Sequence, residues 1–124
     1  MCLKGRKVFG VKNKSVQQIY KDIIAVLRDY FNDRMEGCSI YDITDDPYQT
    51  FTVSFTLYNY YNLVLKYNRG KIEFVILVNK YDGISLKISQ TWLDKADLNV
   101  LCKELDEMVR LRIPDKYLAY YNWE

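Results

Sequence analysis

Four segments in which side chains alternate between two faces constrain the fold of this chain more than any other feature. They cover residues 51–58, 62–67, 72–79 and 84–89. Because successive side chains of a strand point to opposite faces of a sheet, this two-residue period predicts four strands with one buried face each. Of the short breaks between them, Asn59-Tyr60 is a candidate for a tight two-residue turn, while Asn68-Arg69-Gly70 and Asp82-Gly83 are typical of hairpin turns in which glycine supplies a left-handed backbone. The sequence therefore predicts a four-stranded antiparallel meander.

A segment with helical periodicity precedes the meander and predicts a helix over 16–35. Ser15 is suited to cap this helix, since its hydroxyl can accept from an amide of the first turn while Gln18 reaches back. Gly37 lies where a helix C-cap would fall, and the segment Cys38–Ile43 after it is a candidate for a short strand. The apolar face of the expected helix comprises Val16, Ile19, Tyr20, Ile23, Leu27, Tyr30 and Phe31.

A second helix is expected after the meander. Asp94 is its candidate N-cap, and Asp97 would place a negative charge in its first turn, where the helix dipole favours one. Pro114 cannot continue a helix, so we expect it to end the second helix, with one more short helical turn in the segment 115–124. The apolar stripe of this helix comprises Leu98, Leu101, Cys102, Leu105, Met108 and Val109.

Two amphipathic helices and a sheet with one strongly apolar face predict a two-layer α+β sandwich. The expected order is helix, four-stranded antiparallel meander and helix in a single domain, 1–124, with a basic N-terminal arm and a short aromatic C-terminal tail. The side chains expected to face the helices are Phe51, Phe55, Leu65, Phe74, Ile76 and Leu86. Those expected on the opposite, mixed face are Thr52, Ser54, Thr56, Tyr58, Val64, Lys66, Val75, Leu77, Lys87 and Ser89.

The absence of histidine excludes the usual general base near neutral pH and every Ser-His or Cys-His nucleophile pair. Cys2, Cys38 and Cys102 are too widely spaced to begin a zinc site. We expect Cys102 to be a small buried residue on the second helix. The acidic segment 42–46 is interpreted as a solvated turn, with a weak ion site as the alternative. No phosphate-binding glycine loop is present, so we expect a protein that is not an enzyme and holds no cofactor and no metal.

Localisation can be predicted only from what the chain lacks. It contains no apolar run long enough to span a membrane and no signal-peptide pattern, and an odd number of scattered cysteines suits a reducing compartment. We therefore expect a cytoplasmic protein that does not contact a membrane. Lys, Ile, Asn and Tyr outnumber Ala, Gly, Arg and Pro, which indicates an AT-rich genome such as that of a low-GC bacterium or one of its phages.

Basic and aromatic residues supply one candidate function, the binding of single-stranded nucleic acid. Single-strand binders combine a basic groove with aromatic rings on which bases stack. A four-stranded meander with a helix resembles, in element order, the whirly and positive-cofactor-4 types of single-strand binder. The formal net charge of +2 is low for a dedicated binder, so this function is the alternative interpretation. The candidate nucleic-acid contacts are Lys4, Arg6, Lys7, Lys12, Lys14, Arg69 and Lys71.

Tyrosine content favours a protein-binding function instead. Twelve tyrosines and two tryptophans exceed what a core of this size needs, and such side chains are enriched at interfaces. In the tail, we expect Tyr117 and Tyr121 to dock against the domain, while Tyr120 and Trp123 stay available to a partner. The candidate partner-binding residues are Tyr58, Tyr60, Tyr61, Lys66, Tyr81, Lys87, Tyr120 and Trp123.

A small, tyrosine-rich, AT-biased chain without a catalytic motif resembles phage-encoded inhibitors of bacterial defence, including anti-CRISPR proteins. This resemblance implies a non-catalytic module that occupies a surface of a partner. A nucleic-acid-handling complex is the expected partner, because its basic sites would complement the acidic segment 42–46. A homodimer is left open as a further assembly.

Overall fold

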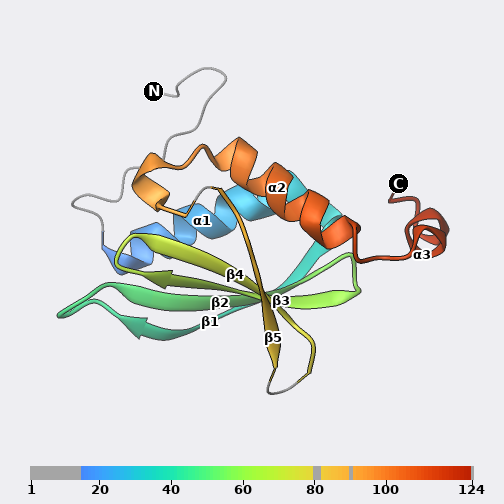
Figure 1. Cartoon of the computed structure of the whole chain (residues 1–124). Helices are drawn as coiled ribbons and strands as arrows, with labels where there is room; N and C mark the ends of the chain where they lie inside the picture. Colours follow the sequence, from blue (N-terminus) through green and yellow to red (C-terminus); the bar gives the residue numbers. More distant parts are fainter. Residues whose placement is uncertain (1–14, 80–81, 90, 124) are drawn as a thin grey trace.

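The computed structural model describes residues 15–79, 82–89 and 91–123. It is an α+β sandwich in which helices cover one face of an open antiparallel sheet, as predicted (Figure 1). The sheet has five strands rather than four, in the order β1-β2-β3-β4-β5. The basic arm 1–14 lies outside the described residues, as do Lys80 and Tyr81. The elements are α1 (Val16–Phe31), the 3₁₀ turn η1 (Asn32–Arg34), β1 (Met35–Thr44), β2 (Thr50–Leu57), β3 (Tyr61–Asn68), β4 (Lys71–Leu77), β5 (Gly83–Leu86), the 3₁₀ turn η2 (Leu93–Lys95), α2 (Leu98–Arg110) and α3 (Asp115–Tyr120).

The first helix begins as expected but ends earlier. The Ser15 side chain accepts a hydrogen bond from the Gln18 amide, and five apolar residues of the predicted face are buried. The helix ends at Phe31 rather than near residue 35, because Asn32 adopts a positive φ of 52°. Gly37 is therefore not a C-cap but lies inside β1.

Strand β1 is longer than the short strand expected over 38–43. It pairs with β2 from Met35 to Thr44, with register shifts between Glu36 and Ser39 and between Tyr41 and Thr44. Positive φ angles at Gly37 and Asp42 lie within these two shifts. Bulges of this kind twist a strand and interrupt its alternation, which is why the sequence pattern does not reveal it.

The hairpin turns agree with the prediction in position, but two differ in detail. Tyr58 and Asn59 both have positive φ, so the β2–β3 turn is centred one residue earlier than Asn59-Tyr60. Gly83 does not have a positive φ; it begins β5, and a Cβ there would lie 2.4 Å from Cγ1 of Val75. Glycine is required at Gly83 for space, not for backbone conformation.

The second helix begins three residues later than the candidate cap Asp94 implies. Asp94 lies within η2, and the N-cap is Asp97, whose carboxylate accepts from the amides of Asn99 (3.0 Å) and Val100 (3.4 Å). The extended backbone of Ala96 separates the two turns. Helix α2 ends at Arg110, four residues before Pro114, and Pro114 is the N-cap of α3.

The core lies between the sheet and helices α1 and α2 (Figure 1). Phe74, in the second-last strand, is fully buried, and Cys102 is buried as expected. The prediction of the inward face is confirmed for all six residues: Phe51, Phe55, Leu65, Phe74, Ile76 and Leu86.

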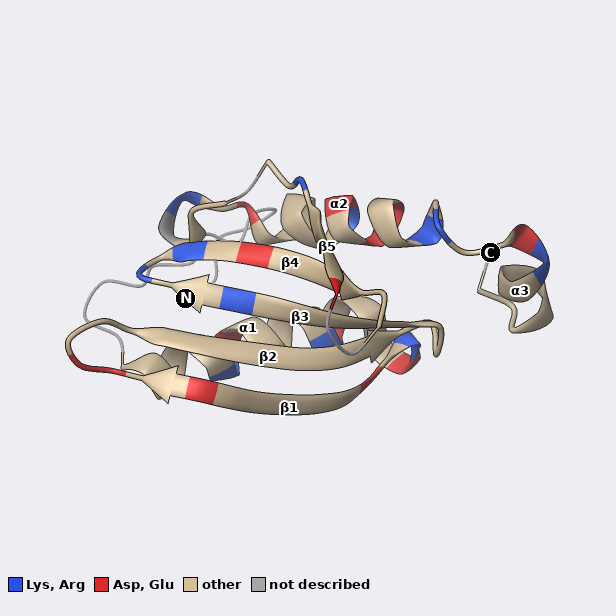
Figure 2. Cartoon of the chain, turned by 60° about the horizontal axis from the view of Figure 1, so that its bottom comes forward, with Lys and Arg blue, Asp and Glu red and all other residues tan. Residues whose placement is uncertain are grey.

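The opposite face carries no described helix; β3 and β4 carry Lys66, Lys71 and Glu73 near one end, and β1 carries the acidic residues Glu36 and Asp42 (Figure 2). Val64 is only 4% exposed there, because it pairs with Ser54 on one side and Val75 on the other. The expectation that Tyr58 lies on this face is wrong. The chain turns at that residue and carries its ring into the core.

Within the described part of the chain, no helix is both long enough and apolar enough to cross a lipid bilayer.

Candidate binding surfaces

An aromatic cluster occupies the end of the sheet at which β2 turns into β3. Its rings come from this turn, the start of β3, α3 and the residues just after α3. The ring centroids of Tyr60 and Tyr117 are 4.7 Å apart, and Tyr121 stacks on Trp123 at 5.0 Å. The full aromatic cluster comprises Tyr58, Tyr60, Tyr61, Tyr117, Tyr120, Tyr121 and Trp123.

Tyr117 fastens α3 to the domain. Its hydroxyl donates toward the carbonyl oxygens of Tyr58 (3.0 Å) and Asn59 (2.9 Å). Desolvation raises the pKa of Tyr117 first, and the neighbouring Tyr121 and Tyr60 hydroxyls add to the increase. Leu118, the next residue, is buried. The tail is therefore docked on the domain and is not a loose extension.

The exposure of the tail rings differs partly from the expectation. Tyr117 docks and Tyr120 stays available, at 79% exposed, as expected. Trp123, expected to be available, is half-buried and packs edge-on against Tyr58 at 5.4 Å. Tyr121, expected to dock, remains 41% exposed. The chain reverses after α3, with the Trp123 amide donating to the Leu118 carbonyl (2.8 Å), and this reversal turns the indole inward.

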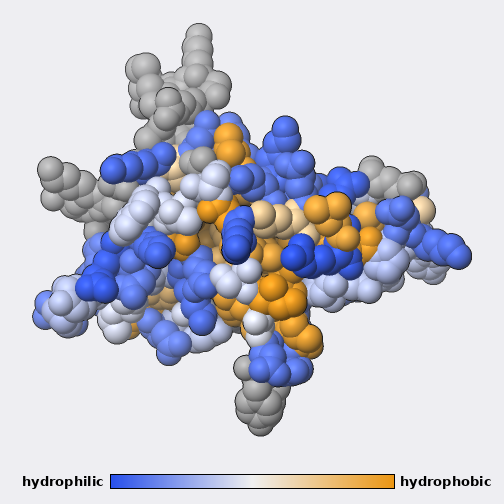
Figure 3. Space-filling model, viewed as in Figure 1, coloured by the Kyte–Doolittle hydropathy of each residue, from blue (hydrophilic) through white to orange (hydrophobic). Residues whose placement is uncertain are grey.

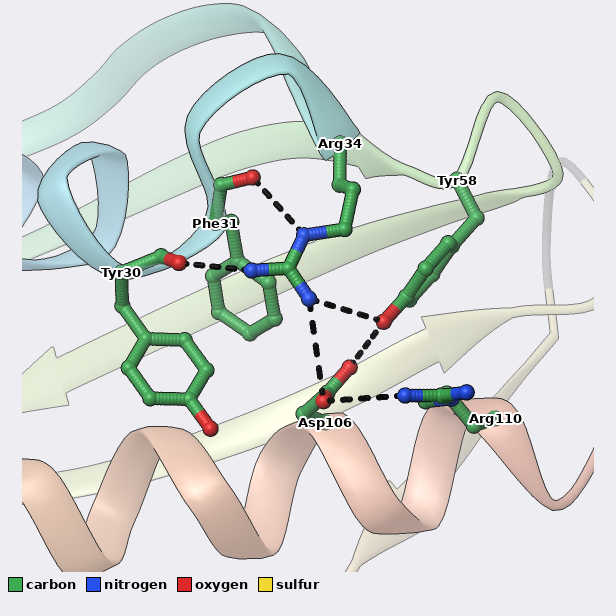
Figure 4. Close-up of polar contacts among 6 residues, drawn as sticks. All are labelled: Tyr30, Phe31, Arg34, Tyr58, Asp106 and Arg110. Carbon is green, nitrogen blue, oxygen red and sulfur yellow. Dashed lines mark hydrogen bonds and ion pairs between the residues drawn. The ribbon is translucent and has the colours of Figure 1, made fainter. Parts of the chain in front are cut away.

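A polar network centred on the buried residues Tyr58 and Asp106 joins the aromatic cluster to α1 and α2 (Figure 4). The Tyr58 hydroxyl donates to the Asp106 carboxylate, and Arg34 Nη1 donates to the Tyr58 hydroxyl oxygen at 3.4 Å. Arg34 and Arg110 each approach the second Asp106 oxygen at 4.0 Å. Burial and then the Asp106 carboxylate raise the pKa of Tyr58 to about 12, so its hydroxyl stays protonated near neutral pH. Because its side chain is fully buried, Tyr58 has a structural role and is not exposed to a partner.

Arg34 links this network to the end of α1. Its Nη2 donates to the Tyr30 carbonyl (2.7 Å), and its Nε donates to the Phe31 carbonyl (3.0 Å). These are carbonyl groups of the last helical turn, which lack partners within the helix. Sequence reasoning missed Arg34 and Asp106; the signal was an acidic residue inside the apolar stripe of the second helix.

A cationic groove of about 670 Å³ lies at the opposite end of the sheet. Strand β5 pairs with β4 as far as Leu86, opposite Phe74, and then leaves it. The chain returns at Trp92, which bridges to Lys71, and the Leu93 amide donates to the Gly70 carbonyl at 2.8 Å. The separation of these two segments opens the groove. Its charged lining comprises Lys66, Arg69, Lys71, Glu73 and Lys87, and its aromatic lining comprises Phe74 and Trp92.

Four cations and one carboxylate line the cationic groove. Glu73 accepts a hydrogen bond from the Ser85 hydroxyl at 2.7 Å. Among the described residues, no carboxylate lies within 4.0 Å of the ammonium groups of Lys66, Lys71 and Lys87. These charges are therefore not neutralised by ion pairs within the described chain.

Two exposed rings flank the β3–β4 turn beside the groove. Trp92 is 51% exposed and lies against Gly70, where a Cβ would be 3.8 Å from the indole. The Arg69 guanidinium lies over the ring of Tyr48, 4.6 Å from its centroid, and Tyr48 is 54% exposed. Sequence reasoning assigned neither ring to a site, because each reaches the turn through tertiary pairing.

The structure thus separates the candidate residues into two groups. Tyr60, Tyr61, Tyr120 and Trp123 lie in the aromatic cluster. Lys66, Arg69, Lys71 and Lys87 lie in the cationic groove. The eight residues of β3 separate the two ends by roughly 25 Å. Tyr81 and the arm residues Lys4, Arg6, Lys7, Lys12 and Lys14 lie outside the described residues.

A third surface is apolar and lies along β5 and the adjoining end of β4, where hydrophobic side chains reach the surface (Figure 3). Leu77, Val78 and Ile84 are exposed there. Strand β5 forms one edge of the sheet but has only four residues. So short an edge strand limits edge-to-edge pairing with other sheets.

No group of three or more Cys, Asp or Glu side chains gathers at a point that suits a metal ion, as far as the described residues go. In the acidic segment, Asp42, Asp45 and Asp46 are exposed, and Asp45 accepts from the Gln49 side chain at 3.2 Å. Burial raises the pKa of the half-buried Cys38 thiol, so the thiol is held in its less reactive protonated form.

Comparison of the chain with protein-family models, with curated proteins and with solved structures found no match.

Proposed function

We propose that this protein is a small non-catalytic binding module that docks a partner protein through its aromatic cluster. The observation that carries the proposal is the placement of Tyr120, which is 79% exposed on a helix fixed to the domain by its neighbours. More specifically, we propose that the protein inhibits a nucleic-acid-handling complex, as phage proteins that block bacterial defence do.

The anchoring of α3 supports an interface role. A helix of six residues is far too short to be stable alone in water, so Tyr117, Leu118 and Trp123 must hold it. Tyr120 is therefore presented on a pre-organised element, and a partner that contacts it pays little ordering entropy. A large side chain with only two torsions to freeze is well suited to be an interface anchor.

The surroundings of Tyr120 resemble an interface in composition. The ring of Tyr121 packs edge-on against Tyr120 at 4.9 Å and is 41% exposed, and Tyr60 is partly exposed beside Tyr117. Charged side chains of Lys116 and Asp115 lie on the same short helix. An apolar centre with a polar rim is the usual arrangement of a protein–protein contact.

Acidic side chains of this protein support a partner that handles nucleic acid. Glu104 and Glu107 lie on α2, the helix that precedes α3, whereas the exposed Asp42, Asp45 and Asp46 lie at the other end of the sheet, away from the aromatic cluster. The α2 carboxylates would complement the basic surfaces of such a complex. The AT-biased composition supports a phage or low-GC bacterial origin.

The proposal is tested by placing a photo-crosslinking amino acid at residue 120 and, as a control, at residue 41. Tyr41 is also an exposed tyrosine, but it lies on β1 rather than in the aromatic cluster. In a bacterial lysate, we expect one discrete protein adduct from position 120 and none of that mass from position 41. Equal labelling from both positions, or none from position 120, would contradict the proposal.

The inhibitory form is tested separately by phage plaquing on bacteria that carry a nucleic-acid-cleaving defence complex. If the crosslinked partner belongs to such a defence complex, expression of the wild-type chain should restore plaquing on bacteria that carry that complex. Tyr120→Ala should lose this effect, and Tyr41→Ala should keep it. If plaquing is restored equally by both variants, the aromatic cluster is not the inhibitory surface.

A further inference from the structure

We propose that the cationic groove binds a segment of single-stranded nucleic acid, with lysines on its phosphates and Trp92 under one base. This inference uses residues at the opposite end of the sheet from the aromatic cluster, so it does not depend on the proposed function. Its ligand class follows from three features of the groove: charge, an exposed ring and shape.

The charge of the groove selects an anion. Lys66, Lys71 and Lys87 have no carboxylate partner within the described chain, and Glu73 is the one carboxylate among the described residues that line the groove. Lysines without ion-pair partners can neutralise phosphates and release the counterions that surround a nucleic acid. An anionic polymer is thus favoured over a neutral or cationic ligand.

The exposed ring selects a polymer that also carries bases. Trp92 is held in place by its backbone bridge to Lys71 and by the contact of its indole with Gly70, yet half of it remains exposed. Every base offers a flat face to such a ring, whereas polyphosphate or an acidic peptide does not. In a duplex the base faces are already stacked, so a single strand is the form that fits.

Arg69, in the β3–β4 turn, extends the cationic groove toward Tyr48. Its guanidinium is held over Tyr48, and its Nε donates to the Asn68 side chain at 3.1 Å. An arginine fixed by a ring and a hydrogen bond loses little freedom when it contacts a phosphate. The strand path that we infer therefore runs from Lys87 and Trp92 across Lys71 toward Arg69.

Glu73 allows a test in which binding should become tighter, because its carboxylate opposes the binding of phosphates. It lies on β4, paired with Lys66 of β3, and its carboxylate accepts a hydrogen bond from the Ser85 hydroxyl. A carboxylate in a phosphate-binding groove opposes binding by like-charge repulsion. Glu73→Gln keeps the shape and the Ser85 hydrogen bond, so it should tighten binding severalfold if the groove is the site.

The test measures fluorescence anisotropy of labelled 15-nucleotide oligo(dT) and oligo(rU) with the full chain between 50 and 200 mM KCl. For single strands, log K falls with log salt by about 0.7 for each phosphate contact. The variant Lys71→Glu with Lys87→Glu should weaken binding more than tenfold and reduce the slope by about 1.4. The control Lys21→Glu with Lys103→Glu changes the net charge equally on exposed helical positions and should have a much smaller effect.

Additional measurements identify the class of ligand and test the role of the Trp92 ring. Trp92→Ala should weaken binding about tenfold, as expected for loss of one stacked base, and Trp92→Phe should recover part of it. Thermal melts of each variant separate loss of fold from loss of binding. A DNA duplex of equal length and polyphosphate at equal charge should compete poorly.

Four outcomes would overturn the inference. They are no binding to either oligomer at 50 mM KCl, equal losses in the groove and control variants, no gain from Glu73→Gln, and polyphosphate competition as strong as that of the oligomer.

Discussion

The Tyr58 hydroxyl donates a hydrogen bond to the Asp106 carboxylate, which joins the β2–β3 turn to α2 beneath the aromatic cluster. Both residues are buried, and Arg34 and Arg110 supply the balancing positive charge. Because Tyr117 binds the backbone of the same turn, the network also fixes the surface on which α3 docks. The position of Tyr120 thus depends on a buried hydrogen bond that no partner can contact.

Tyr58→Phe removes the donor and leaves the Asp106 carboxylate short of one partner. Burying a polar group without its hydrogen bond costs about 1–3 kcal/mol, and we expect a loss of unfolding free energy in that range by urea denaturation. Tyr61→Phe is the matched control, since its hydroxyl donates to the Arg112 carbonyl in an exposed position. Equal losses in the two variants would show that the network does not stabilise the turn.

The pH dependence of this stabilisation follows from the raised pKa of Tyr58, about 12 against an ordinary value of 10. A raised folded-state pKa means that the unfolded chain releases this proton first. The contribution is therefore fully present below pH 10 and is lost as the pH rises from 10 to 12. We expect the difference in melting temperature between wild type and Tyr58→Phe to shrink between pH 9 and 11. A difference that stays constant would contradict the assignment.

Phe74 tests the facing of the sheet. Its ring is fully buried and lies edge-on to Phe55, so Phe74→Ala should cost about 3–5 kcal/mol of unfolding free energy. The adjacent Val75 points to the uncovered face, and Val75→Ala should cost much less. A loss below about 1 kcal/mol for Phe74→Ala would mean that the facing is reversed.

A substitution at Gly83 tests how closely β5 approaches β4. Because a Cβ at this position would lie 2.4 Å from Val75 Cγ1, Gly83→Ala should destabilise the protein by about 1–3 kcal/mol, as overpacking does. Adding Val75→Ala removes the clashing methyl group and should recover part of the loss. Strictly additive effects of the two substitutions in a thermal melt would argue against this contact.

The sheet and its buried face follow from the sequence because β2, β3 and β4 alternate regularly, and Phe51, Phe55 and Phe74 point inward as expected. Strand β1 escaped full prediction because its bulges at Gly37 and Asp42 break the alternation.

The candidate surfaces were harder to predict, since they depend on contacts distant in sequence. Trp92 reaches the groove by pairing with Lys71, and Arg69 finds Tyr48 across a separate loop. The burial of Tyr58 depends on Asp106, 48 residues away, so no local pattern could distinguish it from the exposed tyrosines.

The central claim is that Tyr120 contacts a partner without supporting the fold, and one paired measurement tests it. With the partner recovered by crosslinking at position 120, the dissociation constant and the melting temperature are measured for wild type and Tyr120→Ala. We predict that Kd rises roughly 5- to 150-fold, as for an interface anchor, while the melting temperature changes by less than about 2 °C. A variant that binds as tightly as wild type, or one that unfolds while its folded fraction keeps full affinity, would contradict the claim.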